Sequence, residues 1–323
     1  MTEAILEAQG LTKYYPLQGA AWGRRAGLVR AVDGVDLTVF EGEVFGLVGE
    51  SGCGKSTLGR LMLLLEDPTS GRIFFQGRAL AGLAKSDLKA FRRVAQIVYQ
   101  DPYSSLDPRQ KVGRIIEEPL LIHRIGSRNE RRDRVAWLLE VVGLTPEMAE
   151  RYPHEFSGGQ RQRIAIARAL ALGPKLLLAD EPVSALDVSI QAQILNLLKK
   201  LQAEFGLTYV FISHSLSVVE HLAQRVGVMY LGQMVEQASK AGFYANPLHP
   251  YSQALLSAAP VPDPTAAKQR IILEGDVPSP VNPPAGCSFH PRCPRRMEIC
   301  RREKPVYREV GPGRFLACHL EVS

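Results

Sequence analysis

Short apolar runs separated by polar or glycine-containing turns recur along most of the chain. Runs that are wholly apolar, or that alternate apolar and polar residues with a period of two, predict β-strands. Residues 19–30 are small and basic, and we expect them to form a surface loop. The expected strands lie at 5–9, 31–40, 43–48, 71–75, 95–99, 175–179 and 208–213, with two more across 225–237.

Helices are predicted where apolar residues recur every three or four positions. Strand signal is weak from residue 112 to residue 152, so we expect a helical subdomain, at about 101–165, inserted into an α/β core. Strands alternating with helices around this insertion favour a mostly parallel sheet covered on both faces. The expected helices lie at 58–65, 85–93, 128–142, 164–172, 189–204, 216–222 and 251–258.

The composition changes beyond residue 244, where prolines recur and only 251–258 has a helical pattern. Proline-rich segments of this kind are typical of loops. We therefore expect a core domain at 1–244 and a loop-rich C-terminal extension at 245–323.

Composition and charge narrow the class of protein. The chain has 323 residues, 46% of them hydrophobic and 22% charged, which is typical of a soluble globular protein,. A net charge of +6 allows contact with anionic lipid or nucleic acid but requires neither,. No apolar run approaches a membrane span of roughly 18 residues, and no signal-peptide pattern opens the chain. A cytosolic protein is predicted, with any membrane role depending on a partner.

The loop that begins at Gly49 fits the pattern G-x-x-x-x-G-K-[ST]. An apolar strand precedes it and a helix follows, which is the context of a phosphate-binding loop, or P-loop. Its glycines let backbone N–H groups point at phosphate oxygens, Lys55 adds positive charge, and Ser56 offers a hydroxyl to Mg²⁺. An incidental glycine-rich turn would not need every one of these positions. The predicted nucleotide-binding residues are Gly49, Ser51, Gly52, Cys53, Gly54, Lys55, Ser56 and Thr57.

The apolar strand at 175–179 leads into two acidic residues, Asp180 and Glu181. The carboxyl ends of strands open onto crevices in α/β sheets. There Asp180 would hold Mg²⁺, directly or through water, and Glu181 would orient or deprotonate an attacking water. Two solvated acids at a strand end are the simpler alternative, but the P-loop upstream favours a nucleotide site.

A third segment, Ser157-Gly158-Gly159-Gln160, precedes the helix at 164–172. Ser157 is a good N-cap residue, and the glycines allow close backbone approach, so this helix N-terminus would face a phosphate. Between a P-loop and an acidic strand end, the segment resembles the signature of the ATP-binding cassette (ABC) family. Phe156 stands where that family more often has leucine.

The ABC resemblance implies roles for residues that carry no signal alone. It makes Gln100 the Q-loop glutamine near Mg²⁺ or water, Asp187 part of the D-loop that crosses to a partner cassette, and His214 the switch histidine at the γ-phosphate. It also implies that Tyr15 stacks on adenine, with Tyr14 as the alternative. Ser215 stands where the family usually has aspartate, which leaves the hydrogen bonding beside His214 open.

The implied fold is α/β: a P-loop NTPase core of ABC type with an inserted helical subdomain and a cysteine-containing extension. Segments 99–109, 117–120 and 246–251 resemble the peptide-importer group, and the whole chain is similar to the second ATPase subunit of bacterial dipeptide importers. Oligopeptide, glutathione and nickel importers share these motifs, so the solute stays open.

The peptide-importer resemblance implies a peripheral ATPase on the cytoplasmic face of the bacterial inner membrane. Its implied partners are a paralogous second ATPase subunit, two transmembrane permease subunits and, through the complex, an extracytoplasmic solute-binding protein. Two cassettes would enclose two ATP molecules, each between one P-loop and the other cassette's Ser157-Gly158-Gly159. No nucleic acid is expected.

Four of the five cysteines gather in the extension, and in a reducing cytosol this favours metal ligation over disulfides,. Four thiolates suit either a [4Fe–4S] cluster or Zn²⁺. The peptide-importer resemblance implies an iron–sulfur site, while His290 and His319 keep zinc with mixed ligands open. Four unliganded thiols, and nearby arginines such as Arg292 forming a solvated face, are the simpler alternatives. The cysteines are Cys287, Cys293, Cys300 and Cys318.

The sequence is also compatible with two further interpretations. A soluble ABC ATPase acting on nucleic acid or ribosomes would share the cassette, but such chains usually carry two cassettes or distinctive insertions. The cysteine-containing extension could also sense metal or redox state and regulate the ATPase.

Overall fold

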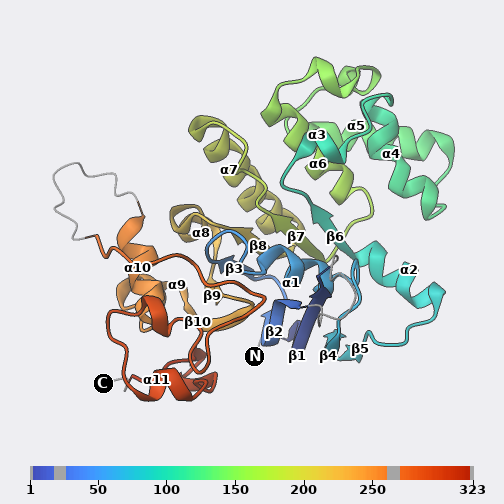
Figure 1. The fold of residues 1–323 in the computed structure, drawn as a ribbon. Coiled ribbons are helices and arrows are strands. Elements are labelled where there is room, and N and C mark those ends of the chain that lie inside the picture. Colours follow the sequence, from blue (N-terminus) through green and yellow to red (C-terminus); the bar gives the residue numbers. More distant parts are fainter. Residues whose placement is uncertain (1–2, 18–26, 260–269, 321–323) are drawn as a thin grey trace. The chain divides into compact units, whose positions relative to one another are not determined.

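The computed structural model describes residues 3–17, 27–259 and 270–320. The chain divides into two compact units, Met1–Ala81 with Ser213–Ser323 and Gly82–Ile212. Figure 1 labels their helices and strands. Within the described ranges, no helix combines the length and the apolar character needed to cross a membrane.

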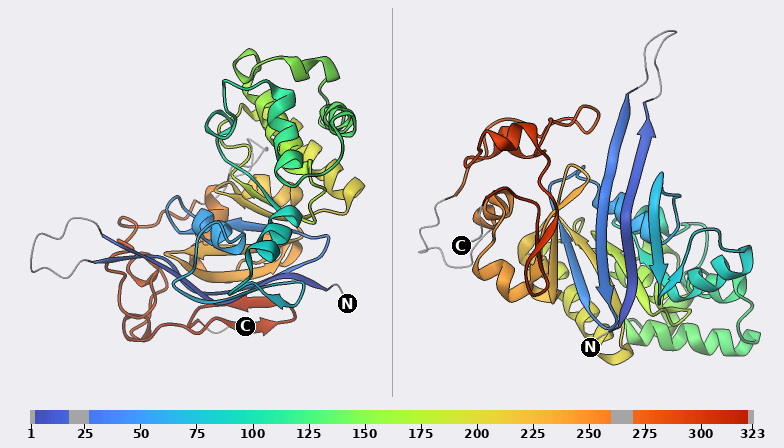
Figure 2. Two further views of the ribbon diagram at one scale, coloured as in Figure 1. Left: turned by 90° about the vertical axis from the view of Figure 1, so that its right-hand side faces the viewer. Right: turned by 90° about the horizontal axis from the view of Figure 1, so that it is seen from below.

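The first unit contains a four-stranded antiparallel sheet in the order β2-β1-β4-β5. Its long strands β1 and β2 lie side by side in the right-hand view of Figure 2. Residues 28–30, expected in a loop, belong to β2, while 18–26 lie outside the described residues. The strands are β1 (Ala4–Pro16), β2 (Leu28–Phe40), β4 (Ser70–Phe75) and β5 (Arg78–Ala79).

A second set of strands in the first unit runs in the order β11-β12-β10-β9-β3. β3 and β9 are parallel, and the other neighbouring pairs are antiparallel. β3 is buried along its whole length, as expected for a strand that is apolar on both faces,. These strands are β3 (Val44–Val48), β9 (Arg225–Tyr230), β10 (Gln233–Ser239), β11 (Arg308–Gly311) and β12 (Arg314–Leu316).

The C-terminal extension is more structured than predicted. The hairpin of β11 and β12 continues the sheet from β10, and two short helices accompany the expected one. These elements are too short to show a periodic pattern, which is why the sequence did not indicate them. The helices of this unit are α1 (Lys55–Met62), α8 (Leu216–Leu222), α9 (Lys240–Ala245), α10 (Pro250–Ala258), η3 (His290–Arg292) and α11 (Ile299–Arg302).

The second unit is built on three parallel strands in the order β6-β7-β8. Between β6 and β7, helices α3 to α6 gather in the region coloured green in Figure 1. The strands are β6 (Ala95–Val98), β7 (Leu176–Asp180) and β8 (Thr208–Ser213, whose last residue falls in the first unit). The α-helices are α2 (Lys85–Val94), α3 (Pro102–Ser105), α4 (Val112–Ile122), α5 (Arg128–Val141), α6 (Gly158–Leu170) and α7 (Val188–Phe205), and the 3-10 helices are η1 (Pro146–Glu150) and η2 (Pro153–Glu155).

The mostly parallel sheet expected from the sequence is correct for the second unit and wrong for the first. Most strand pairs of the first unit are antiparallel. One cause is the turn between β9 and β10, where Leu231 and Gly232 have φ of 43° and 77°. Two consecutive positive φ values make the tight turn of an antiparallel hairpin. The domain boundary at residue 244 stays a prediction.

Candidate nucleotide-binding site

The predicted site residues divide between the two units. Those of the first unit are Tyr15, the P-loop residues from Gly49 to Thr57, His214 and the four C-terminal cysteines. Those of the second unit are Gln100, Ser157, Gly158, Gly159, Gln160, Asp180, Glu181 and Asp187.

The P-loop connects β3 to α1, and the side chain of Lys55 is turned into it. Lys55 is only 4% exposed. Its Nζ donates hydrogen bonds to the carbonyl oxygens of Gly49 at 2.8 Å and Glu50 at 2.9 Å. The first N–H groups of α1 have no partner within the helix and add positive potential at the same end. A buried ammonium beside a helix N-terminus is suited to binding phosphate.

Two glycines of the P-loop are required by the protein itself. Gly49 has φ 155° and Gly54 has φ 105°. A Cβ on Gly49 would lie 2.3 Å from the carbonyl oxygen of Met229, and one on Gly54 would lie 2.1 Å from that of Ala31. The loop is therefore pressed against backbone at β9 and β2. The close approach of this backbone requires glycine at both positions, which the motif alone does not reveal.

Cys53 contributes its backbone to the loop, while its thiol is packed inside. The residue is 5% exposed, and burial raises the pKa of its thiol, although Lys55 opposes the increase. Ser51 and Gly52 are exposed, whereas Ser56 and Thr57 are half-buried in the first turn of α1. The exposed backbone is the part of the loop that a ligand can reach.

Tyr14 and Tyr15 are both tied to acidic residues by their hydroxyl groups. Tyr14 donates to Asp33, and Tyr15 donates to Glu66. Lys13 Nζ lies 5.2 Å from the centre of the Tyr15 ring. Both tyrosines are half-buried, so the stacking of Tyr15 on adenine stays a prediction.

In the second unit, two residues predicted to take part in hydrolysis lie together. Gln100 Nε2 donates a hydrogen bond of 3.3 Å to Glu181 Oε2. Asp180 ends the buried strand β7 and is 8% exposed. The strand therefore delivers Asp180 and Glu181 to its carboxyl end, as predicted.

Glu181 has a left-handed backbone conformation, with φ of 47°. Its N–H donates to the carbonyl oxygen of Ile212 at 3.0 Å, and its own carbonyl accepts from Ser184 Oγ at 3.0 Å. A non-glycine residue held in this region costs about 1 kcal/mol or more, and such residues gather at functional sites. This backbone conformation was not visible in the sequence.

Ser157 forms the N-cap of α6, as predicted, and Gln160 completes a capping box. Ser157 Oγ accepts from the Gln160 N–H at 3.3 Å, and Gln160 Oε1 accepts from the Ser157 N–H at 3.0 Å. The serine and the glutamine three residues later are the sequence signal for this box. Gly159 has a packing role, because a Cβ there would lie 2.5 Å from Cγ2 of Ile190.

Asp187 and His214 are both exposed. Asp187 is the N-cap of α7, and its neighbour Val188 is 82% exposed. His214 lies between β8 and α8. The neighbouring Ser215 N–H donates to Ser213 Oγ at 3.0 Å.

The four C-terminal cysteines are free thiols, and they lie close enough together to influence the pKa of Cys287. Burial raises the pKa of Cys287 to about 11, and the other three cysteines add to the increase. The Cys287 N–H donates to the carbonyl oxygen of Cys300 at 2.8 Å. Among the described residues, however, no three or more His, Cys, Asp or Glu side chains are arranged to hold a metal ion. The expected [4Fe–4S] or Zn²⁺ site is not supported by this geometry.

Two family models match the chain. Residues 32–184 match the ABC transporter model, and residues 235–300 match the model of the oligopeptide/dipeptide transporter C-terminal region. The first match covers the P-loop, the capping box and Asp180 with Glu181. The second covers α10 and three of the four clustered cysteines.

Curated relatives align over almost the whole chain. The probable peptide ABC transporter ATP-binding protein y4tS of Sinorhizobium fredii is 55% identical over 99% of this chain and 91% of its own length. The oligopeptide transport ATP-binding protein AppF of Bacillus subtilis is 54% identical over 98% of both chains. The dipeptide transport ATP-binding protein DppF of Escherichia coli is 51% identical over 98% of this chain and 95% of its own.

Solved ATP-binding cassettes share the fold. A dimeric post-hydrolysis structure of the cassette MJ0796, bound to ADP and Pi, is 32% identical with a TM-score of 0.64, covering 73% of this chain and 98% of that one. The protein cbiO1 of Clostridium perfringens, part of the ABC transporter complex cbiONQ, is 27% identical with a TM-score of 0.65, covering 76% of this chain and 92% of its own.

Proposed function

The chain belongs to the family of ABC transporter ATP-binding proteins, and from this premise we propose that it is the ATP-hydrolysing subunit of a bacterial dipeptide or oligopeptide importer. One observation carries the proposal: an ABC region and a peptide-transporter C-terminal region occur together in a chain whose relatives align with it nearly end to end. Transport of nickel or glutathione is the closest alternative.

The proposed roles follow the chemistry of each side chain. Lys55 and the P-loop N–H groups would bind the phosphates, and His214 would contact the γ-phosphate. Glu181 would accept a proton from the attacking water. Gln100, which donates a hydrogen bond to the Glu181 carboxylate, would hold that carboxylate in place.

Magnesium fits the oxygen donors that the chain offers. Mg²⁺ prefers hydroxyl, amide and carboxylate oxygens, and when bound it neutralises phosphate charge. The proposed ligands are Ser56, Gln100 and Asp180. Tyr15 would stack on adenine.

We further propose that hydrolysis takes place across a dimer of cassettes. The MJ0796 cassette is dimeric in its post-hydrolysis state, which supports this arrangement by similarity. The P-loop of one cassette would share an ATP with Ser157, Gly158 and Gly159 of the other, and Asp187 would lie at the contact. The second cassette would be a paralogous ATPase, and both would dock on two permease subunits at the cytoplasmic face of the inner membrane.

The proposal is tested by reconstituting the chain with permease subunits, a second ATPase and a solute-binding protein in proteoliposomes. We expect a peptide-loaded binding protein to stimulate ATP hydrolysis and peptide uptake. Nickel and glutathione, loaded on the same binding protein, serve as comparisons. Stimulation by either of them alone would replace the peptide assignment, and co-purification with DNA or ribosomes instead of permeases would contradict the importer.

A [4Fe–4S] cluster on the four C-terminal cysteines is a second proposal, with Zn²⁺ as its alternative. It is supported by the number of thiols and by their mutual influence on pKa. Since the described side chains do not form a coordination group, binding would require them to turn toward a common centre.

The cluster is tested by measuring iron and acid-labile sulfide in the anaerobically purified full-length chain. We expect about four of each per chain, lost in Cys287→Ser. Cys53→Ser removes the one cysteine outside the group and should leave the metal content unchanged. Stoichiometric zinc without sulfide would contradict the cluster, and the absence of metal would contradict both versions.

A further inference from the structure

Glu50, a P-loop residue that the motif leaves unspecified, is held at three points. Its carbonyl oxygen accepts from Lys55 Nζ at 2.9 Å. Its backbone N–H donates to the hydroxyl oxygen of Tyr251 at 2.9 Å. Its carboxylate receives two hydrogen bonds from Arg292, with Nη1 to Oε2 at 2.8 Å and Nη2 to Oε1 at 3.1 Å. Two of the three points are supplied by the C-terminal extension.

Tyr251 and Arg292 both come from a closely packed part of the extension. Tyr251 lies in the first turn of α10 and is fully buried, and Arg292 ends η3. The ring of Phe289 packs edge-on against Tyr230 at 5.2 Å between centroids and lies 5.4 Å from that of Tyr251. This aromatic cluster therefore fixes the positions from which Tyr251 and Arg292 reach the P-loop.

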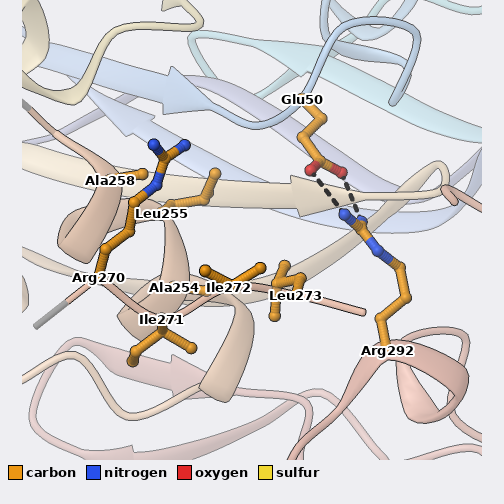
Figure 3. Close-up of a pocket in the computed structure, with 9 residues that line it drawn as sticks. All are labelled: Glu50, Ala254, Leu255, Ala258, Arg270, Ile271, Ile272, Leu273 and Arg292. Atoms are coloured by element: carbon orange, nitrogen blue, oxygen red, sulfur yellow. Dashed lines mark hydrogen bonds and ion pairs between the residues drawn. The ribbon is translucent and has the colours of Figure 1, made fainter. Parts of the chain in front are cut away.

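The ion pair of Arg292 and Glu50 is shielded from water on the arginine side. The Arg292 side chain is 9% exposed and that of Glu50 is 29% exposed. Figure 3 shows the paired guanidinium and carboxylate together with residues of α10 and residues 270–273. These residues line a hollow of about 410 Å³. Bidentate pairs of this kind fix direction as well as distance. Removing one partner would leave the other charged group poorly solvated.

A second contact of the extension reaches the region of the predicted adenine site. Lys304 Nζ lies 3.2 Å from Asp33 Oδ2, and Asp33 also accepts from the hydroxyl of Tyr14. The Arg30 N–H donates to the carbonyl oxygen of Pro280 at 3.1 Å. The extension thus contacts both the P-loop and β2, which pairs with the strand β1 that carries the two tyrosines.

We propose that Arg292 and Tyr251 are positioning residues of the P-loop, through which the C-terminal extension sets the affinity of the loop for ATP. Arg292 and Tyr251 hold the main chain of Glu50 so that its carbonyl faces the ammonium of Lys55 and its N–H faces the hydroxyl of Tyr251. Loss of this hold lets the first turn of the loop reorient, and the phosphate-binding N–H groups that follow lose their alignment. Cys293 follows Arg292 directly in the chain. A displacement of the cysteines would therefore move Arg292 and, through its ion pair, Glu50 of the P-loop. This inference rests on the proposed ATP binding.

The test uses the full-length chain and measures the dissociation constant for ATP by calorimetry, with the thermal midpoint as a check on folding. Arg292→Ala and Tyr251→Phe are each expected to raise the dissociation constant for ATP, by about tenfold for the arginine. Arg292→Lys should recover part of the loss. Glu50→Gln combined with Arg292→Ala should cost no more than the single changes, because both remove the same pair. Arg302→Ala, which breaks an exposed pair with Glu298 in the same extension, is the matched control and should bind as wild type.

The outcomes separate this inference from the proposed function. If the wild-type chain does not bind ATP, the proposed function fails. If it binds ATP and both Arg292→Ala and Tyr251→Phe, which keeps the ring and its packing, fold and bind ATP within twofold of wild type, the positioning role is overturned. Additive losses in the double variant would equally overturn it, because they would show that Arg292 does not act through Glu50. A fall in thermal midpoint with unchanged ATP affinity would mean that the contact serves stability alone.

Discussion

Glu181→Gln is expected to abolish ATP turnover while leaving ATP binding intact. The amide has nearly the shape of the carboxylate but cannot accept a proton from water. Loss of a general base costs about 10²- to 10⁴-fold in rate. Gln100 lies 3.3 Å from the Glu181 carboxylate, so the change also alters the group that faces the Gln100 amide.

The measurement is steady-state phosphate release by the assembled transporter, together with ATP affinity and the dimeric state of the isolated chain. We expect bound ATP to accumulate and the closed dimer to persist, because hydrolysis is what would release it. Glu150→Gln is the control, since this exposed carboxylate forms an ion pair of 2.7 Å with the exposed Lys111 and has no proposed role in hydrolysis. Full turnover by Glu181→Gln would remove Glu181 from the role of base.

Gly54→Ala is expected to prevent ATP binding and to destabilise the first unit. A Cβ at this position would lie 2.1 Å from the carbonyl oxygen of Ala31, and the backbone φ is 105°. The unfavourable φ costs about 1–2 kcal/mol. Relief of the overlap requires the backbone to move and costs about 1–3 kcal/mol more. Since Gly54 is the N-cap of α1, that movement displaces the N–H groups that would bind phosphate.

Gly52→Ala provides the matched comparison within the same loop. Gly52 also has a positive φ, 77°, but a Cβ there would meet no described atom within 4 Å. We expect Gly52→Ala to lower the free energy of unfolding by about 1 kcal/mol, from strain alone. Denaturant titration and ATP calorimetry on both variants would test the difference. Equal losses of stability would show that the contact with Ala31 does not constrain the loop.

Much of the fold could be predicted because its central strands are distinctive in composition. Strands β3, β7 and β8 are apolar on both faces and are buried along their whole length. The start of α6 was less accurate, since the helix begins at Gly158 and glycine signals a turn before it signals a helix,. The hairpin β11–β12 was missed because it draws its stability from pairing with β10, which local sequence does not record.

The sequence by itself determined the chemistry of this protein: the P-loop, the acidic residues after β7 and the serine–glycine segment each consist of residue types that suit nucleotide binding wherever they fold. Tertiary structure alone decided how these groups are held. Glu181 has a left-handed backbone, and its N–H donates to Ile212 on another strand. Gly54 lies against Ala31, and Glu50 pairs with Arg292. Each of these contacts brings together residues that are far apart in the chain. A motif records local composition, whereas strain, steric contact and burial of an ion pair depend on which distant segments the core brings together.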